Sequence, residues 1–112
     1  MGEVYLAEDT RLGRKVALKI LLADYFEDRE RKERFYREAK TAAGISNPHV
    51  MAIHDLGSAP DPDSGKDLDY IVMEYIDGVS LSQHIERIQG DLKVVIRLAE
   101  QIAGGLNAAH QL

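Results

Sequence analysis

The alternation of apolar and polar residues predicts that the chain begins with a β-hairpin. Residues 3–8 alternate, with Val4 and Leu6 on one face, and a second, more apolar run covers residues 15–22. A period of two is typical of strands. The polar residues 10–14 between the two runs predict a turn.

The spacing becomes helical from residue 28 to about residue 45. Apolar side chains recur there every three or four positions, as on one face of a helix: Phe35, Ala39, Ala42 and Ile45. Gly44 and Pro48 are typical of a helix end. Two further strands are predicted at residues 49–56 and 67–75, separated by a polar turn at residues 58–65.

Two helices are predicted after this, at residues 80–88 and from residue 91 onward. The element order predicts an α+β fold, with a twisted antiparallel sheet, one principal helix and the start of a helical lobe. One side of the last helix is apolar: Leu92, Val95, Ile96, Ala99, Ile102, Leu106 and Ala109. Few elements remain to cover this side, so we expect further packing partners.

Composition and charge narrow the classes of partner. Of the 112 residues, 45% are hydrophobic and 29% are charged, as in an ordinary globular domain. The net charge of −5 argues against nucleic acid as the main partner. The sequence has no cysteine, no apolar run long enough for a membrane span and no signal peptide, so a cytoplasmic location is expected.

Lys19 and Glu38 are the most informative charged residues. Lys19 lies inside the apolar run of residues 16–22, where alternation places it on one face with Ala17 and Leu21. Glu38 lies in the predicted helix, where it could pair with Lys19 across the sheet–helix interface and fix an ammonium for holding phosphate. The alternatives are a lysine that emerges at a sheet edge and a surface glutamate paired with Arg34.

Other candidate features are weaker on their own. Gly2 precedes a strand, where backbone amides could approach a phosphate, and Val4 could cover a flat ligand. The strand and connector of residues 70–78 could read a purine through backbone groups, or could be only a core strand and its exit. The histidines lack metal-ligand spacing, and residues 61–72 fail as a calcium loop because Lys66 replaces its glycine.

In combination, these segments resemble consecutive motifs of the Hanks-type serine/threonine protein kinases of bacteria. The resemblance covers essentially the whole chain and rests on six segments in order: G-E-V-Y-L-A, V-A-L-K, F-Y-R-E-A, N-P-H-V, Y-I-V-M-E-Y-I-D-G-V-S-L and A-G-G-L-N-A-A-H. It implies an N-terminal kinase lobe at residues 1–76, without its first strand, and the start of the C-terminal lobe at residues 77–112.

The resemblance also implies the phosphate-binding groups. Lys19 is similar to the strand lysine that contacts the α- and β-phosphates of ATP, and Glu38 to its helix partner. Gly2 resembles the third glycine of the glycine-rich loop. Val4 is similar to the valine that covers adenine, and Ala17 to the alanine that lines the same pocket.

The connector is implied to hold the purine. Met73 resembles the residue at the back of the adenine pocket. Glu74 and Ile76 match positions whose backbone C=O and N–H groups bind adenine, and Ser80 falls near the ribose.

The resemblance implies ATP with Mg²⁺ and a protein substrate phosphorylated on serine or threonine. The sequence contains no H-R-D, D-F-G or A-P-E, so the catalytic base and the Mg²⁺ ligands of the family are missing from these residues. We therefore expect this fragment alone to be inactive, and the reading frame to continue into those motifs. A non-catalytic interaction module and a lobe of a small-molecule phosphotransferase are the alternatives.

Overall fold

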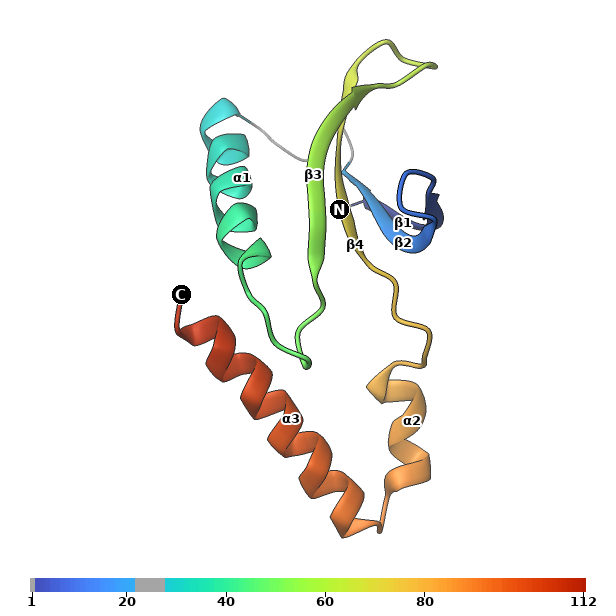
Figure 1. The fold of residues 1–112 in the computed structure, drawn as a ribbon, viewed down its shortest axis with the longest axis vertical. Coiled ribbons are helices and arrows are strands. Elements are labelled where there is room, and N and C mark those ends of the chain that lie inside the picture. Colours follow the sequence, from blue (N-terminus) through green and yellow to red (C-terminus); the bar gives the residue numbers. More distant parts are fainter. Residues whose placement is uncertain (1, 22–27) are drawn as a thin grey trace.

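The computed structural model describes residues 2–21 and 28–112. It contains four strands, β1 Gly2–Asp9, β2 Arg14–Leu21, β3 Ile53–Pro60 and β4 Asp67–Glu74, and three helices, α1 Arg29–Ala43, α2 Leu81–Ile88 and α3 Leu92–His110 (Figure 1). The element order and the α+β fold predicted from the sequence are confirmed. The predicted end of the second strand, at Leu22, lies outside the described residues.

The four strands form one antiparallel sheet with the order β1-β2-β4-β3. The turn between β1 and β2 is held by Asp9, whose carboxylate accepts hydrogen bonds from the backbone N–H groups of Arg11 and Leu12. Gly13 has φ 65°, in the left-handed region that favours glycine. Its N–H donates to the carbonyl of Asp9 at 2.7 Å, which closes the predicted hairpin.

The third strand begins and ends later than the sequence predicts. The side chain of Asn47 accepts a hydrogen bond from the N–H of His49, and the N–H of Val50 donates to the carbonyl of Asn47. This turn occupies the predicted start of the strand. At its other end β3 stays paired with β4 as far as Pro60, which lies opposite Asp67, and the turn is shorter than predicted.

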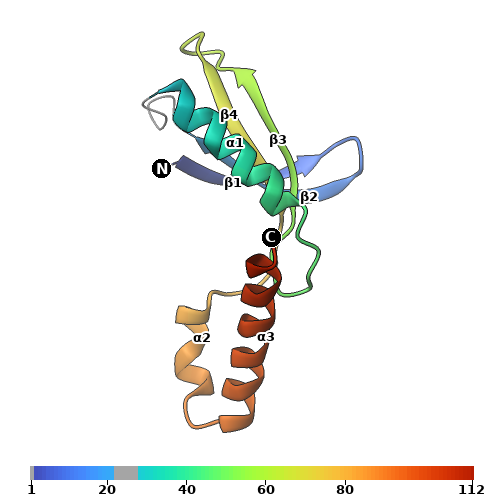
Figure 2. The ribbon, with the colours of Figure 1, turned by 90° about the vertical axis from the view of Figure 1, so that its left-hand side faces the viewer.

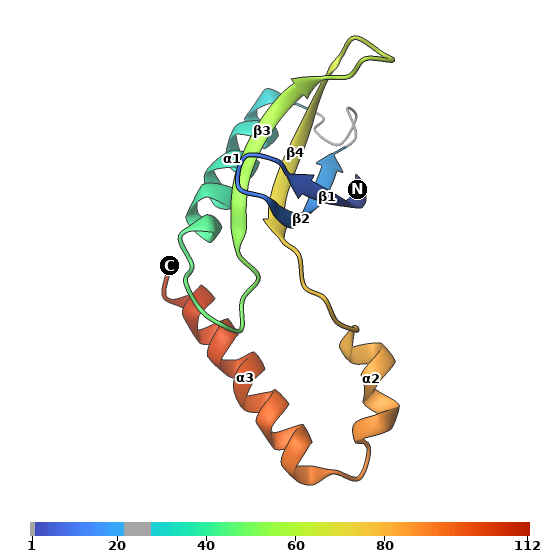
Figure 3. The ribbon, with the colours of Figure 1, turned by 45° about the vertical axis from the view of Figure 1, so that its right-hand side comes forward.

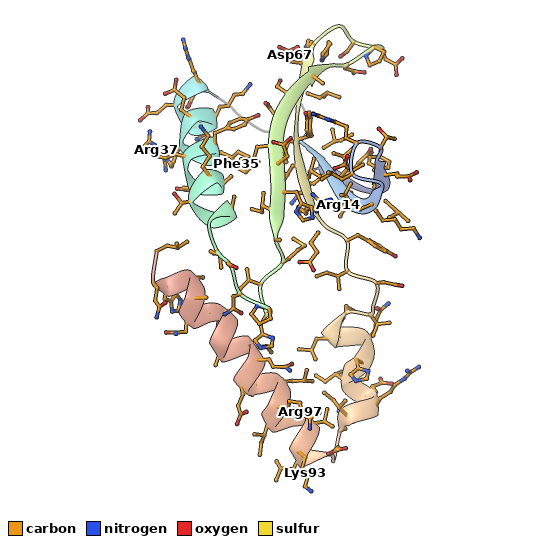
Figure 4. The ribbon with its side chains drawn as sticks, in the orientation of Figure 1. Arg14, Phe35, Arg37, Asp67, Lys93 and Arg97 are labelled. Carbon is orange, nitrogen blue, oxygen red and sulfur yellow. The ribbon has the colours of Figure 1, made fainter. Side chains whose placement is uncertain are left out.

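Helix α1 covers one face of the sheet beside β3 (Figure 2). Asp28 caps its N-terminus by accepting a hydrogen bond from the N–H of Arg31 at 2.7 Å. With the right-hand side of Figure 1 brought forward, the β1–β2 hairpin lies in front of the long β3 and β4 strands and α1 lies behind them (Figure 3). The side chain of Phe35 points from α1 toward the sheet, and Arg37 points away from it (Figure 4).

Helices α2 and α3 form a separate hairpin below the sheet (Figures 1 and 3). The molecule is elongated, with extents of 53 × 29 × 28 Å. An apolar groove of about 290 Å³ lies between the two helices, lined by Leu81, Ile85, Ile88, Gln89, Val95, Leu98, Ala99 and Ile102. Leu92, Ile96 and Leu106 are exposed on α3, as the sequence predicts. In the described part of the chain, no helix is both long and apolar enough to cross a membrane.

The loop from α1 to β3 packs against α3. A Cβ at Gly105 would lie 2.9 Å from the carbonyl oxygen of His49 and 3.3 Å from Cγ2 of Val50. A Cβ at the preceding Gly104 would meet nothing closer than the His49 ring, at 3.8 Å. Of these two adjacent glycines, Gly105 is therefore the one that lies against the loop.

Candidate functional site

Four of the predicted site residues share one face of the sheet. Lys19 lies opposite Val4 in β1 and opposite Ile71 in β4. Ala17 lies opposite Met73 in the next row of that face. Directly opposed residues of an antiparallel ladder point to the same side, and the side alternates along each strand. Val4, Ala17, Lys19 and Met73 therefore project from a single surface.

This surface is the one that α1 covers. Asp69 precedes Ile71 by two residues in β4, so its side chain leaves the sheet on the same side as that of Lys19. Tyr36 of α1 donates its hydroxyl hydrogen to the carboxylate of Asp69, and Lys32 of α1 places its Nζ 3.3 Å from the same carboxylate. Lys19 consequently lies on the helix-covered face, as the sequence predicts.

The predicted ion pair between Lys19 and Glu38 is not formed. The ion pairs between described residues are Arg14–Asp9, Arg29–Glu33 and Lys32–Asp69. The side chain of Glu38 is exposed. The reason is the rotation of α1, because Tyr36 points to the sheet and two residues further along a helix correspond to about 200° of rotation. Lys19 is half-buried and interacts with its surroundings.

The cluster of Lys32, Tyr36 and Asp69 was not predicted from the sequence. Asp69 is 8% exposed and lies in the same row as Leu21, which is 2% exposed. Burial, and then the hydrogen bond to Asp69, raise the pKa of the Tyr36 hydroxyl above its ordinary value. The sequence contains one signal of this cluster. Among the alternate strand positions Asp69, Ile71 and Met73, a carboxylate stands where an apolar residue is expected. The helix opposite has a lysine and a tyrosine four residues apart.

The connector after β4 presents backbone N–H groups without a partner among the described residues, and that of Ile76 is one of them. The N–H of Ile76 makes no hydrogen bond to any described residue, and Ile76 is 61% exposed. Glu74 anchors the start of the connector: its carboxylate accepts a hydrogen bond from the N–H of Ala52 at 3.0 Å, and its own N–H donates to the carbonyl of Ala52 at 2.8 Å.

Ser80 lies at the end of the connector, where the structure gives it a local role. It caps the N-terminus of α2 in a reciprocal capping box with Gln83. Its hydroxyl also lies 3.0 Å from that of Ser82.

Comparison with known proteins identifies the family. The protein kinase domain family matches residues 1–112. The chain belongs to the protein kinases of the bacterial Hanks type. It is 42% identical to serine/threonine-protein kinase PrkC of Bacillus subtilis and 42% identical to serine/threonine-protein kinase PknB of Mycobacterium tuberculosis, in each case over 99% of this chain. These matches cover 16% of PrkC and 18% of PknB, so the chain spans less than a fifth of either relative.

The fold of this kinase segment is similar to that of solved kinase domains. The crystal structure of the Mycobacterium tuberculosis PknI kinase domain superposes with a TM-score of 0.74 at 33% identity, over 99% of this chain and 44% of that one. The similarity agrees with a sheet and one helix from the N-terminal lobe, followed by helices of the C-terminal lobe.

Gly2 of the kinase segment occupies a position that admits no side chain. A Cβ built on Gly2 would overlap the carbonyl oxygen of Ile20 in the neighbouring strand. Gly2 lies opposite Leu21, one row along the shared face from Val4 and Lys19. The sequence predicts that the backbone at Gly2 can approach a phosphate closely. In the structure this backbone also lies close to the neighbouring strand β2.

Proposed function

We propose that this chain is the ATP-binding portion of a kinase that phosphorylates serine and threonine residues of proteins. The observation that carries the proposal is the shared face of Val4, Ala17, Lys19 and Met73. Three of these side chains are uncharged and suited to the flat faces of a purine, and the fourth is a cation suited to phosphate oxygens.

The geometry supports a specific placement of the nucleotide. Adenine packs against Val4 and Ala17, which project from the same face of the sheet, with Met73 at the back of the pocket. The N–H of Ile76 donates to the purine, because it is exposed and has no other described partner. The carbonyl of Glu74 accepts from the purine. Ser80 lies near the ribose, although its hydroxyl already takes part in the capping of α2.

Lys19 and Glu38 provide the phosphate end of the site. Lys19 contacts the α- and β-phosphates, and Glu38 orients its ammonium when α1 turns toward the sheet. Positioning and charge stabilisation of this kind are the main contributions of a protein to phosphoryl transfer. Residues 1–76 supply this nucleotide-binding lobe, and residues 77–112 begin the helical lobe that receives the protein substrate.

The transfer step needs groups that these residues do not contain. No aspartate of an H-R-D or D-F-G motif is present, so nothing here matches the catalytic base or the Mg²⁺ ligands of the family. We therefore expect the 112 residues alone to bind ATP without transferring its phosphate. ATP-dependent transfer to proteins also fits a cytoplasmic location for this segment.

A chimaera tests the proposal. Residues 1–112 replace the matching segment of PrkC, which supplies the remaining parts of a kinase domain. We expect the chimaera to phosphorylate a protein substrate on serine or threonine, and Lys19→Met to lower kcat/KM by about 100-fold or more. Lys66→Met, in the β3–β4 turn, is the matched control. A folded chimaera that binds no ATP, or whose activity survives Lys19→Met, would overturn the proposal.

A further inference from the structure

The cluster of Lys32, Tyr36 and Asp69 joins α1 to the sheet through a buried charge. Asp69 is 8% exposed, and the neighbouring positions on its face include Leu21, opposite it in β2, Ser58, opposite it in β3, and Ile71, two residues along β4. An ionised carboxylate in such surroundings is destabilising unless it is paired and hydrogen-bonded. Both of the side chains that satisfy it come from one turn of α1.

The hydroxyl of Tyr36 has two possible acceptors for its one hydrogen. They are the carboxylate of Asp69 and, at 3.2 Å, the carbonyl oxygen of Gly57 in β3. A charged acceptor forms the stronger hydrogen bond, so Asp69 takes the hydrogen. Tyr36 consequently touches β3 and β4 at once, and fixes both the rotation and the height of α1 above these strands.

Departure of α1 from the sheet would leave Asp69 buried without either partner. The cost of an unpaired buried charge therefore opposes any movement of α1 at this point. Glu38 lies two residues after Tyr36 in the same helix, so its position relative to Lys19 follows from the same anchor.

We propose that Tyr36, Lys32 and Asp69 are positioning residues that hold α1 at the rotation in which Glu38 points away from Lys19. This inference rests on the proposed function, because it assigns the cluster to the phosphate end of the nucleotide site. The cluster touches neither the adenine-binding connector nor Val4, so it acts on phosphate binding and leaves purine binding unchanged.

The first measurement reports on α1 without any nucleotide. The chain has no cysteine, so nitroxide labels can be attached at Arg37→Cys, on the side of α1 that faces away from the sheet, and at Leu12→Cys in the β1–β2 turn. Electron paramagnetic resonance gives the distance distribution between them. We expect one narrow distribution in the parent chain and a shifted or broadened one in Tyr36→Phe and in Asp69→Asn.

The second measurement compares the affinities of the same variants for ATP and for adenosine. We expect Tyr36→Phe and Asp69→Asn to strengthen ATP binding about fivefold or more, because α1 is then free to turn Glu38 toward Lys19, and to leave adenosine binding unchanged. Lys32→Arg keeps the charge and should retain the parent ratio of ATP affinity to adenosine affinity, whereas Lys32→Met should raise it. A general loss of folding would lower both affinities together.

Two substitutions serve as matched controls. Tyr5→Phe removes a hydroxyl that also donates to a carboxylate, that of Glu3, but on the other side of the sheet from α1. Asp67→Asn changes an exposed carboxylate on the same face of β4, two residues before Asp69. Both should match the parent in distance distribution and in the ratio of the two affinities.

The outcomes separate this inference from the proposed function. An unchanged distance distribution in Tyr36→Phe and Asp69→Asn overturns the positioning role, whatever the nucleotide data show. A changed distribution with an unchanged or lowered ratio of ATP to adenosine affinity overturns it as well. Failure of the parent chain to bind either nucleotide overturns the proposed function, and with it the link to phosphate binding.

Discussion

Val4 lies directly opposite Lys19 in the ladder between β1 and β2, so the two side chains leave the sheet on the same side. The branched apolar side chain of Val4 and the ammonium of Lys19 therefore lie next to one another on the face of the sheet that α1 covers. Each has a separate task in the proposed site, purine contact for Val4 and phosphate contact for Lys19, and the two tasks can be measured separately.

Val4→Ala should weaken adenosine and ATP binding by the same factor, about fivefold, because it removes apolar contact with the purine alone. Isothermal titration with each nucleotide measures this. Tyr5→Val, one residue along β1 and on the opposite face, is the control and should leave both affinities unchanged. A loss confined to ATP would contradict the placement of adenine against Val4.

Lys19→Met should weaken ATP binding about tenfold or more and leave adenosine binding unchanged, because the phosphates are the part of the nucleotide that contacts the ammonium. The comparison uses the same titrations, with Lys66→Met as the control for loss of one positive charge. Equal effects on ATP and adenosine would show that Lys19 supports the fold and does not bind phosphate.

The adjacent glycines of α3 should respond in opposite ways to alanine. Gly104→Ala should stabilise the chain by about 0.5–1 kcal/mol, because alanine favours a helix interior and the new methyl group meets nothing closer than 3.8 Å. Gly105→Ala should destabilise it by about 1–3 kcal/mol, because the methyl group would press on the carbonyl of His49. Urea unfolding at low concentration measures both, and destabilisation by both variants would show that α3 itself requires glycine.

The stability of the chain should fall at alkaline pH partly through Tyr36. The folded chain holds the Tyr36 proton to a higher pH than the unfolded chain does, because the pKa of this hydroxyl is raised in the fold from its ordinary value of 10.0. The corresponding stabilisation is complete below about pH 10 and is lost as the pH rises above it, where the unfolded chain releases the proton. The free energy of unfolding should therefore fall less in Tyr36→Phe than in the parent between about pH 9 and about pH 11. Equal slopes would contradict the raised pKa.

The isolated chain should associate as its concentration rises. Leu92, Ile96, Ile102 and Leu106 are exposed along α3, and exposed apolar surface of this kind drives association. Light scattering after size-exclusion chromatography should show a mass that increases with loading, and Ile102→Glu with Leu106→Lys should reduce the increase. A monomer at all concentrations with a sharp, cooperative unfolding transition would contradict this prediction.

Much of the fold could be predicted from the spacing of apolar residues, because a strand presents every second side chain to the core and a helix every third or fourth. The alternation around Lys19 placed that residue on the correct face. The start of β3 was predicted too early, because the side chain of Asn47 forms a turn that hydrophobicity does not reveal. Errors of this kind lie at the ends of strands and helices, where single hydrogen bonds decide at which residue the element begins or ends.

The candidate site was harder to predict where it depends on packing. The helical repeat gave the apolar side of α1 but not its rotation on the sheet, which is set by the contact of Tyr36 with Asp69. These residues are 33 positions apart, and a carboxylate at an inward strand position indicates that a partner is needed but not which residue supplies it. The exposed position of Glu38 follows from this contact, so it could not be read from the helix alone.

The close approach of Gly105 to His49 has a mechanical consequence for the two halves of the molecule. The chain passes from the sheet to the helical hairpin through the connector after Glu74, and the loop before β3 rests on α3 at Gly105. The connector and this loop contact together hold the helical hairpin beside the sheet. A bulkier residue at position 105 would act as a wedge between α3 and the loop, and would tilt the hairpin relative to the sheet.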